Sequence, residues 1–316
     1  MKKSVSVILG LSICGVVALL IFVFVCWNRI YVWTLGDVNS MYAKALDAYR
    51  SRQYEDAVPL FGKIAKIDSA AYANFLLGDM YYRGLGVEVD YEKSFAFFSK
   101  SAELNHLAAY NNWAIMYLNA HGVEADYSKA FRHFQYAANN GYSNALLGLG
   151  TMYRHGWGTE RNSSKAFDCY RRSAAHDNAD AMNNLGYMYA KGRGTKMDIE
   201  MALHWYRKAA SKNHPVAQYN IAALYSEGRG LEHDLSKCAE WLRKSALQGF
   251  SGAQFNLGNM YYLGKGVERD WSEAERWYRL AMEQGHRHAV QFLKRLEEER
   301  NIEELDSTFV IQLVME

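Results

Sequence analysis

Glycine pairs, histidines and cysteines are the residue types in this chain that could support chemistry. Pairs such as Gly84-Leu85-Gly86 and Gly264-Lys265-Gly266 could cradle a phosphate, while histidine and cysteine could hold a metal. The glycine pairs, however, recur in five of six similar units, between predicted helices and after no predicted strand. A phosphate loop follows a strand, so the pairs predict helix ends, where glycine adopts positive φ.

The ten histidines do not form a predicted site. His286 and His288 are the closest pair, and His106 and His214 fall at predicted turns between units. No nucleophile lies beside a base in a catalytic pattern. We therefore predict a protein that is not an enzyme, with no cofactor and no metal.

The sulfur-containing residues have the spacing of core residues. Cys14 and Cys26 lie in an N-terminal apolar run, while Cys169 and Cys238 fall in predicted helices two units apart, beyond disulfide reach. We expect the latter two to be small core residues. The recurring methionines have the same interpretation: Met80, Met116, Met152, Met188 and Met260.

Composition favours many short helices. Half of the 316 residues are hydrophobic, and only two prolines accompany 24 glycines. The net charge of +2 arises from mixed acidic and basic residues, which argues against nucleic acid as a partner.

The N-terminus predicts a membrane anchor. Lys2 and Lys3 precede an uncharged run of 24 residues, from Ser4 to Trp27, that would span about 36 Å as a helix. Trp27, Tyr31 and Trp33 are typical interfacial anchors. We predict a single-pass protein of the bacterial inner membrane, anchored through residues 4–27, with the remaining chain on the periplasmic side.

Two other fates of the N-terminus remain open. The sequence around Cys14 resembles a bacterial lipobox, although Ile13 is larger than the small residue expected there, and the apolar run continues beyond it. A secreted form would require cleavage after the run, where no small-x-small site follows.

A fixed period organises the rest of the chain. Alanine recurs every 36 residues, and tyrosine keeps the same step eight residues later. Such a period predicts stacked copies of one small unit. The alanines are Ala73, Ala109, Ala145, Ala181, Ala217, Ala253 and Ala289, and the tyrosines are Tyr81, Tyr117, Tyr153, Tyr189, Tyr225 and Tyr261.

Each unit predicts two helices. Apolar residues at steps of 0, 4, 7 and 8, as in Ala181, Leu185, Met188 and Tyr189, form one face of the first helix. After the glycine pair, an aspartate or asparagine is placed to cap the second helix. These capping residues are Asp90, Asp126, Asn162, Asp198, Asp234 and Asp270.

The repeated pattern resembles the Sel-one-like repeat, a 36-residue relative of the tetratricopeptide repeat. Residues 181–210 carry the pattern almost completely, in Ala181, Leu185, Gly186, Met188, Tyr189, Gly192, Gly194, Asp198, Ala202, Trp205, Tyr206, Ala209 and Ala210. The resemblance implies an all-α, right-handed α-solenoid. An enzymatic branch of this family, described as binding or hydrolysing β-lactams, has paired cysteines in each repeat, and this chain lacks them.

We expect four parts in the chain. Residues 1–36 form the anchor and its flank, and 37–70 a tetratricopeptide-like unit in which Pro59 is unusual inside the second helix. Six Sel-one-like repeats cover 71–286, as 71–106, 107–142, 143–178, 179–214, 215–250 and 251–286. Residues 287–316 form a capping helix and an apolar tail.

The resemblance also implies where a partner would bind. If tetratricopeptide geometry carries over, first helices line an inner groove that suits an extended peptide or a helix, although the same positions would equally form a solvated concave face. The candidate groove residues are Phe75, Asp79, Tyr82, Asn111, Ile115, Leu118, Leu147, Thr151, Arg154, Asn183, Tyr187, Tyr219, Ser226, Phe255, Asn259 and Tyr262.

The sequence thus favours a membrane-anchored, non-catalytic scaffold or adaptor with a protein or peptide partner. One alternative is an envelope enzyme or binder acting on β-lactam or peptidoglycan-type ligands, and another is a secreted or lipidated interaction factor.

Overall fold

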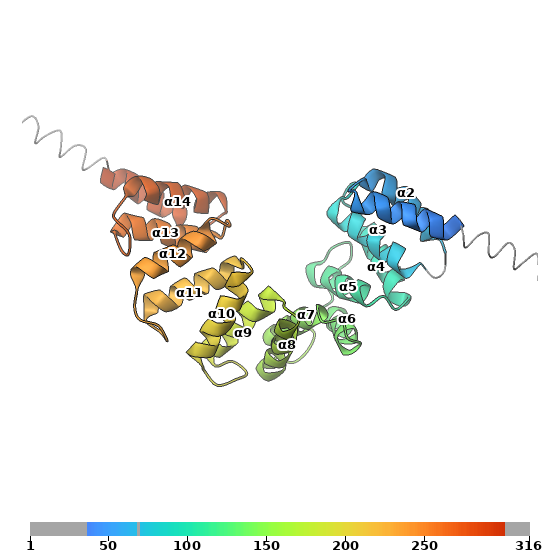
Figure 1. Ribbon diagram of the computed structural model, residues 1–316, viewed down its shortest axis with the longest axis horizontal. Helices are drawn as coiled ribbons and strands as arrows, with labels where there is room; N and C mark the ends of the chain where they lie inside the picture. The colour runs from blue at the N-terminus through green and yellow to red at the C-terminus, as the bar shows by residue number, and fades with distance from the viewer. Residues whose placement is uncertain (1–36, 68–69, 301–316) are drawn as a thin grey trace, which may run out of the picture. The chain divides into compact units, whose positions relative to one another are not determined.

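Helices and short turns make up the described part of the protein. The computed structural model describes residues 37–67 and 70–300, and within these ranges it contains helices and no strand (Figure 1). The expected all-α repeat fold is confirmed for these residues. No helix among them is long and apolar enough to cross a bilayer. The predicted anchor at 4–27 and the tail after residue 300 lie outside the described residues.

The chain divides into two compact units. Unit 1 covers Met1–Tyr136 and unit 2 covers Ala137–Glu316, so the division falls within a helix, α6 (Tyr127–Asn139). The 36-residue period of the sequence gives no signal at this position.

The described part of unit 1 begins with a helix through residues 37–50, which precedes α2 (Tyr54–Ile64). Pro59 lies inside α2, and the helix continues past it. Ala45, Ala57 and Phe61 of this predicted tetratricopeptide-like unit are fully buried. The next helices are α3 (Ala71–Arg83), α4 (Tyr91–Glu103) and α5 (Leu107–Asn119), followed by α6.

Unit 2 repeats the helix pair four times (Figure 1). Each first helix packs on the second helix of its own repeat, and each second helix packs on the first helix of the following repeat. The pairs are α7 (Ala145–His155) with α8 (Ser163–Ala175), α9 (Ala179–Lys191) with α10 (Ile199–Ser211), α11 (Pro215–Glu227) with α12 (Leu235–Ala246), and α13 (Ser251–Leu263) with α14 (Trp271–Glu283). A last helix covers residues 289–300.

The predicted caps close the second helices. In α10, the Asp198 carboxylate accepts a hydrogen bond from the Met201 backbone N–H at 2.9 Å, and all six predicted capping residues make the equivalent bond. Their own backbone N–H groups donate to the carbonyl of the ladder tyrosine, as from Asp198 to Tyr189 at 3.0 Å. The cap therefore also ties each second helix to the first.

The glycine pairs turn the chain and allow two repeats to approach. Gly192 ends α9 in the left-handed conformation, with φ of 61°. Gly194 has φ of 73°, and a Cβ added there would lie 2.2 Å from the Ser163 carbonyl oxygen of the preceding repeat. The second glycine is thus required by repeat packing, which gives the pair a structural role at these positions.

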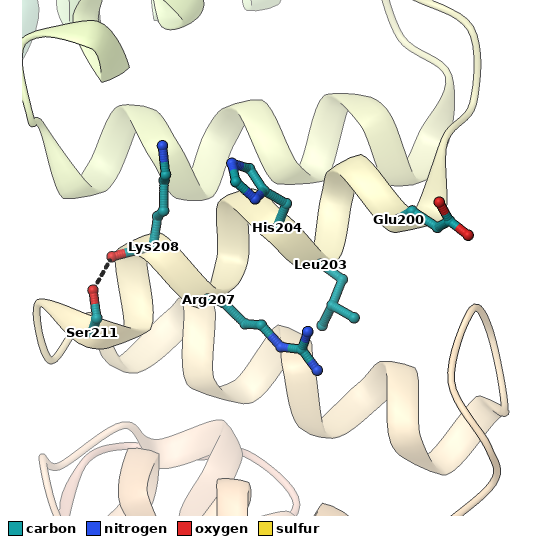
Figure 2. Close-up of a pocket in the computed structure, with 6 residues that line it drawn as sticks. All are labelled: Glu200, Leu203, His204, Arg207, Lys208 and Ser211. Carbon is teal, nitrogen blue, oxygen red and sulfur yellow. Dashed lines mark hydrogen bonds between the residues drawn. The ribbon is translucent and has the colours of Figure 1, made fainter.

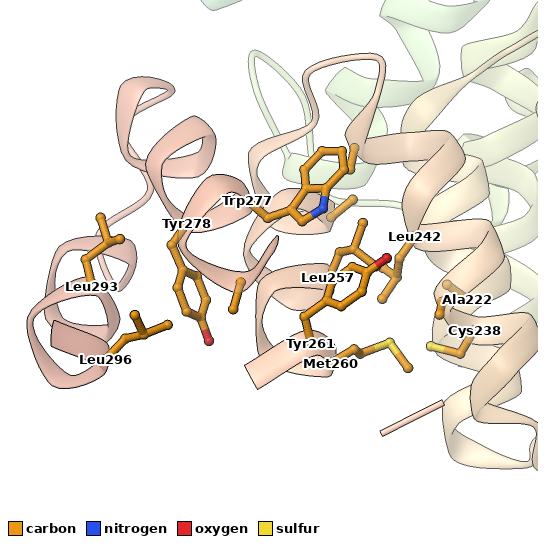
Figure 3. Packing of buried hydrophobic residues seen from close by; sticks show 14 residues of the cluster. Ala222, Cys238, Leu242, Leu257, Met260, Tyr261, Trp277, Tyr278, Leu293 and Leu296 are labelled. Carbon is orange, nitrogen blue, oxygen red and sulfur yellow. The ribbon is translucent and has the colours of Figure 1, made fainter. Parts of the chain in front are cut away.

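The alanine ladder lies in the core. All seven alanines of the 36-residue step are fully buried, and the five methionines that recur seven residues after them are buried as well. Small residues let the helices approach, while rings from the second helices fill the remaining space. Near the end of unit 2, Trp277 and Tyr278 are fully buried, and Figure 3 shows Leu293 and Leu296 beside Tyr278.

Candidate partner-binding site

The predicted groove positions lie on the first helices but differ in exposure. Most are half-buried and Ser226 is exposed, whereas Asn111 and Asn183 are buried. These two asparagines depart from the expected open face, because their amides make contacts within the protein. Asn111 donates to the Asn112 side-chain oxygen at 3.1 Å, and Asn183 accepts from the Asn220 amide at 2.9 Å.

In unit 1, three predicted positions meet in one pocket. Asp79 and Tyr82 from α3 and Ile115 from α5 line a cavity of about 380 Å³, which Arg83, Phe98 and Asn112 complete. Its apolar surfaces come from Phe98, Ile115 and the Tyr82 ring. The pocket spans two consecutive repeats, so it requires the packing of α3 against α4 and of α4 against α5.

A carboxylate with two donors lies at this pocket. The Tyr49 hydroxyl donates to the Asp79 carboxylate at 3.3 Å, and the Arg83 guanidinium lies 3.4 Å from the same oxygen. Burial, followed by the charge of Asp79, raises the pKa of Tyr49 to about 12. The Tyr49 hydroxyl therefore stays protonated at neutral pH and holds the carboxylate in place.

Tyr82 is fixed by a histidine of the next repeat. Its hydroxyl shares a hydrogen bond of 3.1 Å with Nδ1 of His121, whose ring stacks on Tyr91 at 4.5 Å. Burial raises the pKa of Tyr82. These contacts leave the Tyr82 ring as a pre-positioned wall of the pocket, which lowers the entropy cost of binding.

The other predicted positions of unit 1 lie elsewhere on the first helices. Phe75 packs on the Phe98 ring at 5.8 Å and on the His106 ring at 4.6 Å, so most of its surface serves the junction between repeats. Leu118 is half-buried on α5 and does not line the pocket.

In unit 2, several predicted positions bond within their own repeat. The Thr151 hydroxyl donates to the Leu147 carbonyl at 3.0 Å and lies 3.1 Å from the Tyr170 hydroxyl. Arg154 donates to the neighbouring His155 ring at 2.9 Å. The described part of unit 2 therefore uses these side chains in local contacts.

The remaining predicted positions on α9 and α11 also make contacts within the protein. The Tyr187 ring lies under the Arg193 guanidinium at 5.3 Å, and the Tyr219 hydroxyl accepts from the Asn256 amide at 3.2 Å. The exposed Ser226 hydroxyl bonds the Ala223 carbonyl at 3.0 Å.

The helix over residues 289–300 covers the predicted positions of α13. Phe255 contacts the Phe292 ring at 5.1 Å and the His286 ring at 4.3 Å, and Tyr262 donates to the Glu299 carboxylate. Asn259 accepts from the Tyr278 hydroxyl at 2.7 Å. The aromatic residues expected at the C-terminal end of the groove thus pack against the capping helix.

A second hollow lies on a helix face that the sequence interpretation did not consider. Glu200, Leu203, His204, Arg207, Lys208 and Ser211, all from α10, line a cavity of about 450 Å³ (Figure 2). A signal was available, because arginine recurs every 36 residues at Arg171, Arg207, Arg243 and Arg279.

His133 and the two cysteines of the repeats lie in packed, partly or fully buried surroundings. In the described ranges, no group of three or more His, Cys, Asp or Glu residues could hold a metal. His133 stacks on Trp113 at 4.0 Å, and burial, assisted by Arg132 and Lys129, lowers its pKa to about 4. Cys169 and Cys238 are free and buried, as predicted, and burial raises the pKa of each thiol to about 11. A thiol with such a pKa is a poor nucleophile at neutral pH.

The comparison with protein families decides the identity of the repeats. The Sel1 repeat model matches residues 71–106, 107–142, 143–178, 179–214, 215–250 and 251–286. The chain belongs to the Sel1 repeat family. Sel1 repeat proteins generally mediate protein–protein interactions and generally serve as non-catalytic scaffolds.

Solved structures of similar proteins support this assignment. A Sel1 repeat protein from Oxalobacter formigenes is 31% identical, with a TM-score of 0.66, and the match covers 77% of this chain and 70% of that one. A protective antigen of uropathogenic Escherichia coli with an SLR fold is 29% identical, also with a TM-score of 0.66. The match covers 77% of the present chain and 52% of the antigen, so the present chain spans about half of the antigen's length. A search of the curated proteins gives no match.

Proposed function

We propose that this Sel1 repeat protein is a non-catalytic scaffold that recruits a protein partner through the pocket between α3 and α5. The cavity of about 380 Å³ carries this proposal, because it gathers Asp79, Tyr82 and Ile115 at one place. Protein partners are generally bound through an apolar or aromatic anchor in a pocket with a polar rim.

The chemistry of the pocket suits one apolar side chain of a peptide or helix. Phe98, Ile115 and the Tyr82 ring would contact the side chain, while the Asp79 carboxylate would accept from backbone or side-chain donors of the partner. Asp79 is held by the Tyr49 hydroxyl and Arg83, so this acceptor is already oriented before the partner arrives.

We further propose that residues 4–27 anchor the scaffold in the bacterial inner membrane, with the repeats on the periplasmic side. The support is the uncharged run of 24 residues between Lys3 and Asn28, which is long enough for a bilayer core. The adaptor would then hold its partner at the membrane surface.

Crosslinking and co-purification from intact membranes test the pocket. Ile115→Lys places a charge in the cavity, and Leu118→Lys makes the same change on the same helix outside it. A long charged side chain that fills the anchor site should reduce partner recovery at least tenfold. Leu118→Lys should change recovery less than twofold. Equal recovery from Ile115→Lys and the unaltered protein would show that the pocket is not the docking site.

The mass of the mature protein tests the anchor. An uncleaved anchor leaves residues 1–27 in place, and the protein resists extraction from membranes by alkaline carbonate. Loss of residues 1–13 with an added lipid indicates the lipoprotein, and loss of 1–27 indicates the secreted form.

A further inference from the structure

A row of arginines runs along the second helices of unit 2. Arg171, Arg207, Arg243 and Arg279 lie 36 residues apart on α8, α10, α12 and α14, and all four are exposed. The next residue in the first three helices is also basic and exposed: Arg172, Lys208 and Lys244.

The two ends of this row are neutralised by carboxylates of their own helices. Arg171 pairs with Asp168 at 2.6 Å, and Arg279 pairs with Glu275 at the same distance. Such pairs three or four residues apart are common on helix surfaces. At these two places the arginine has a structural partner.

The centre of the row lacks this neutralisation. At the position that Asp168 has on α8, α10 holds His204 and α12 holds Glu240. Among the described residues no carboxylate forms an ion pair with Arg207, Lys208 or Lys244. Lys208 lies over the Trp205 ring at 4.8 Å, and Lys244 over the Trp241 ring at 4.2 Å. The rings orient the ammonium groups without cancelling their charge.

The hollow on α10 lies at this unneutralised centre. Arg207 and Lys208 line it together with Glu200, His204, Ser211 and the apolar Leu203 (Figure 2). The Ser211 hydroxyl is already bonded to the Lys208 carbonyl at 2.8 Å. Arg207 and Lys208 are therefore the basic groups left to meet a ligand, beside the apolar Leu203, while Glu200 lies toward the start of the helix.

We propose that the exposed face of α10 and α12 docks an acidic, extended segment of a partner protein. Its carboxylates would pair with Arg207, Lys208 and Lys244, because charge complementarity selects an acidic ligand and the guanidinium fork matches a carboxylate. α11 packs on both α10 and α12, so the ligand would cross from one second helix to the other as an extended chain, which advances about 3.3 Å per residue.

The acidic residues within the face favour a peptide over a continuous polyanion. Glu200 on α10 and Glu240 on α12 would repel closely spaced phosphates of nucleic acid or of lipid headgroups. A peptide can place uncharged residues opposite them. This second surface goes beyond the proposed function, since it lies on second helices of unit 2 and acts independently of the pocket in unit 1.

Fluorescence anisotropy of the purified full chain tests the proposal. The probe is a fluorescein-labelled peptide with glutamate at every third position and serine between, and its control has glutamine in place of glutamate. Arg207→Gln/Lys208→Gln should weaken binding of the acidic probe about fivefold at low salt, since each exposed pair contributes modestly. Arg171→Gln/Arg172→Gln removes the same charge beside Asp168 and should change binding less than twofold.

The outcomes separate the possible ligands. If both double variants lost the same affinity for the acidic probe, net charge alone would explain the binding and the docking site would be wrong. Equal affinity for the acidic and glutamine probes would also overturn it. If duplex DNA or phosphatidylserine vesicles bind more tightly than the acidic probe and lose affinity through Arg207→Gln/Lys208→Gln, the partner class is wrong. Ile115→Lys should leave this binding unchanged, so a failure of the pocket in unit 1 would be seen separately.

Discussion

Lysine at one repeat position has different roles in unit 1 and unit 2. In unit 1, Lys100 donates to the Ala65 carbonyl at 2.7 Å and so satisfies the C-terminal end of α2. In unit 2, the equivalent Lys208 and Lys244 lie over tryptophan rings and pair with no described carboxylate. The same residue type supports packing in one unit and leaves a free charge in the other.

This difference shows how a shared backbone can carry two kinds of surface. Both units use the same caps and close glycine approaches. The cavity lined by Asp79, Tyr82 and Ile115 of first helices lies in unit 1, whereas the basic residues without an ion pair lie on second helices of unit 2. Substitutions that alter the shared backbone features should therefore have the same effect on stability in the two units. Substitutions of the side chains that differ should have different effects on stability or binding.

Alanine at the position of the second turn glycine of a unit tests the shared backbone most severely. A Cβ at Gly122 in unit 1 would lie 2.2 Å from the Tyr91 carbonyl oxygen, and a Cβ at Gly194 in unit 2 would lie 2.2 Å from that of Ser163. We expect Gly122→Ala and Gly194→Ala each to cost about 3 kcal/mol, from positive φ plus a clash that only backbone movement relieves. Urea unfolding followed by circular dichroism measures the cost.

Gly141→Ala is the matched control for this substitution. Gly141 has φ of 95°, but no atom lies within 4 Å of its added Cβ. It should cost only about 1 kcal/mol, the strain of positive φ alone. If all three substitutions had the same cost, close approach between repeats would not explain the second glycine.

A histidine makes unit 1 sensitive to acid. Burial lowers the pKa of His133 to about 4, below its ordinary 6.5, because the stacked ring is poorly hydrated when charged. Between pH 6.5 and pH 4, His133 is protonated in the unfolded chain but still neutral in the folded protein. The free energy of unfolding therefore decreases as the pH falls through this range. Because the ring is only partly buried, we expect a loss of about 1 kcal/mol.

His133→Phe measures this contribution, since phenylalanine occupies the equivalent position at Phe97. The difference in urea midpoint between pH 7 and pH 4 should be smaller in the variant than in the unaltered protein. The equivalent positions in unit 2 hold Cys169, Trp205, Trp241 and Trp277, none of which titrates in this range. An unchanged pH dependence would assign the acid sensitivity to other groups.

Local physical rules made the repeat fold predictable. The alanine step, the capping residues and the helix-ending glycines act within a few residues of their own position, so the sequence indicates them directly. Asp198 caps α10 and Gly192 ends α9 for reasons that hold in any helix. The sequence also predicted that Cys169 and Cys238 are free, because two units of separation put them beyond disulfide reach.

The site was predictable only in part, because it depends on contacts between repeats. The sequence placed Asp79, Tyr82 and Ile115 on first helices. Their common cavity depends on how α3 and α5 each pack against α4, which the sequence does not indicate. The burial of Asn183 depends on Asn220 in the next repeat, and the covering of Phe255 depends on Phe292. The arginine period was readable, yet only the structure shows that Arg207 lacks a carboxylate partner.

The capping aspartates should behave alike in both units. Asp126 in unit 1 accepts from the Lys129 N–H at 2.8 Å, and Asp234 in unit 2 accepts from the Lys237 N–H at 2.9 Å. Asp126→Ala and Asp234→Ala should each lower Tm by about 2–4 °C, because each leaves a helix N-terminus uncapped. Asparagine at either position should retain most of the Tm, since Asn162 caps α8 in the same way. A shift confined to one unit would contradict the shared backbone.

The smallest expected effect returns to the lysines. Lys100→Met keeps the aliphatic stem but removes the donor to the Ala65 carbonyl, so it should cost about 1 kcal/mol. Lys244→Met removes a cation from the Trp241 ring and should cost about 0.5 kcal/mol, because the site is exposed. Lys244→Met should nevertheless weaken binding of the acidic probe, whereas Lys100→Met should not, since only Lys244 lies on the docking face. Urea unfolding and anisotropy on the same two variants would separate the stabilising lysine from the binding one. Loss of probe binding in Lys100→Met to the same degree would mean that the free charge in unit 2 has no special role.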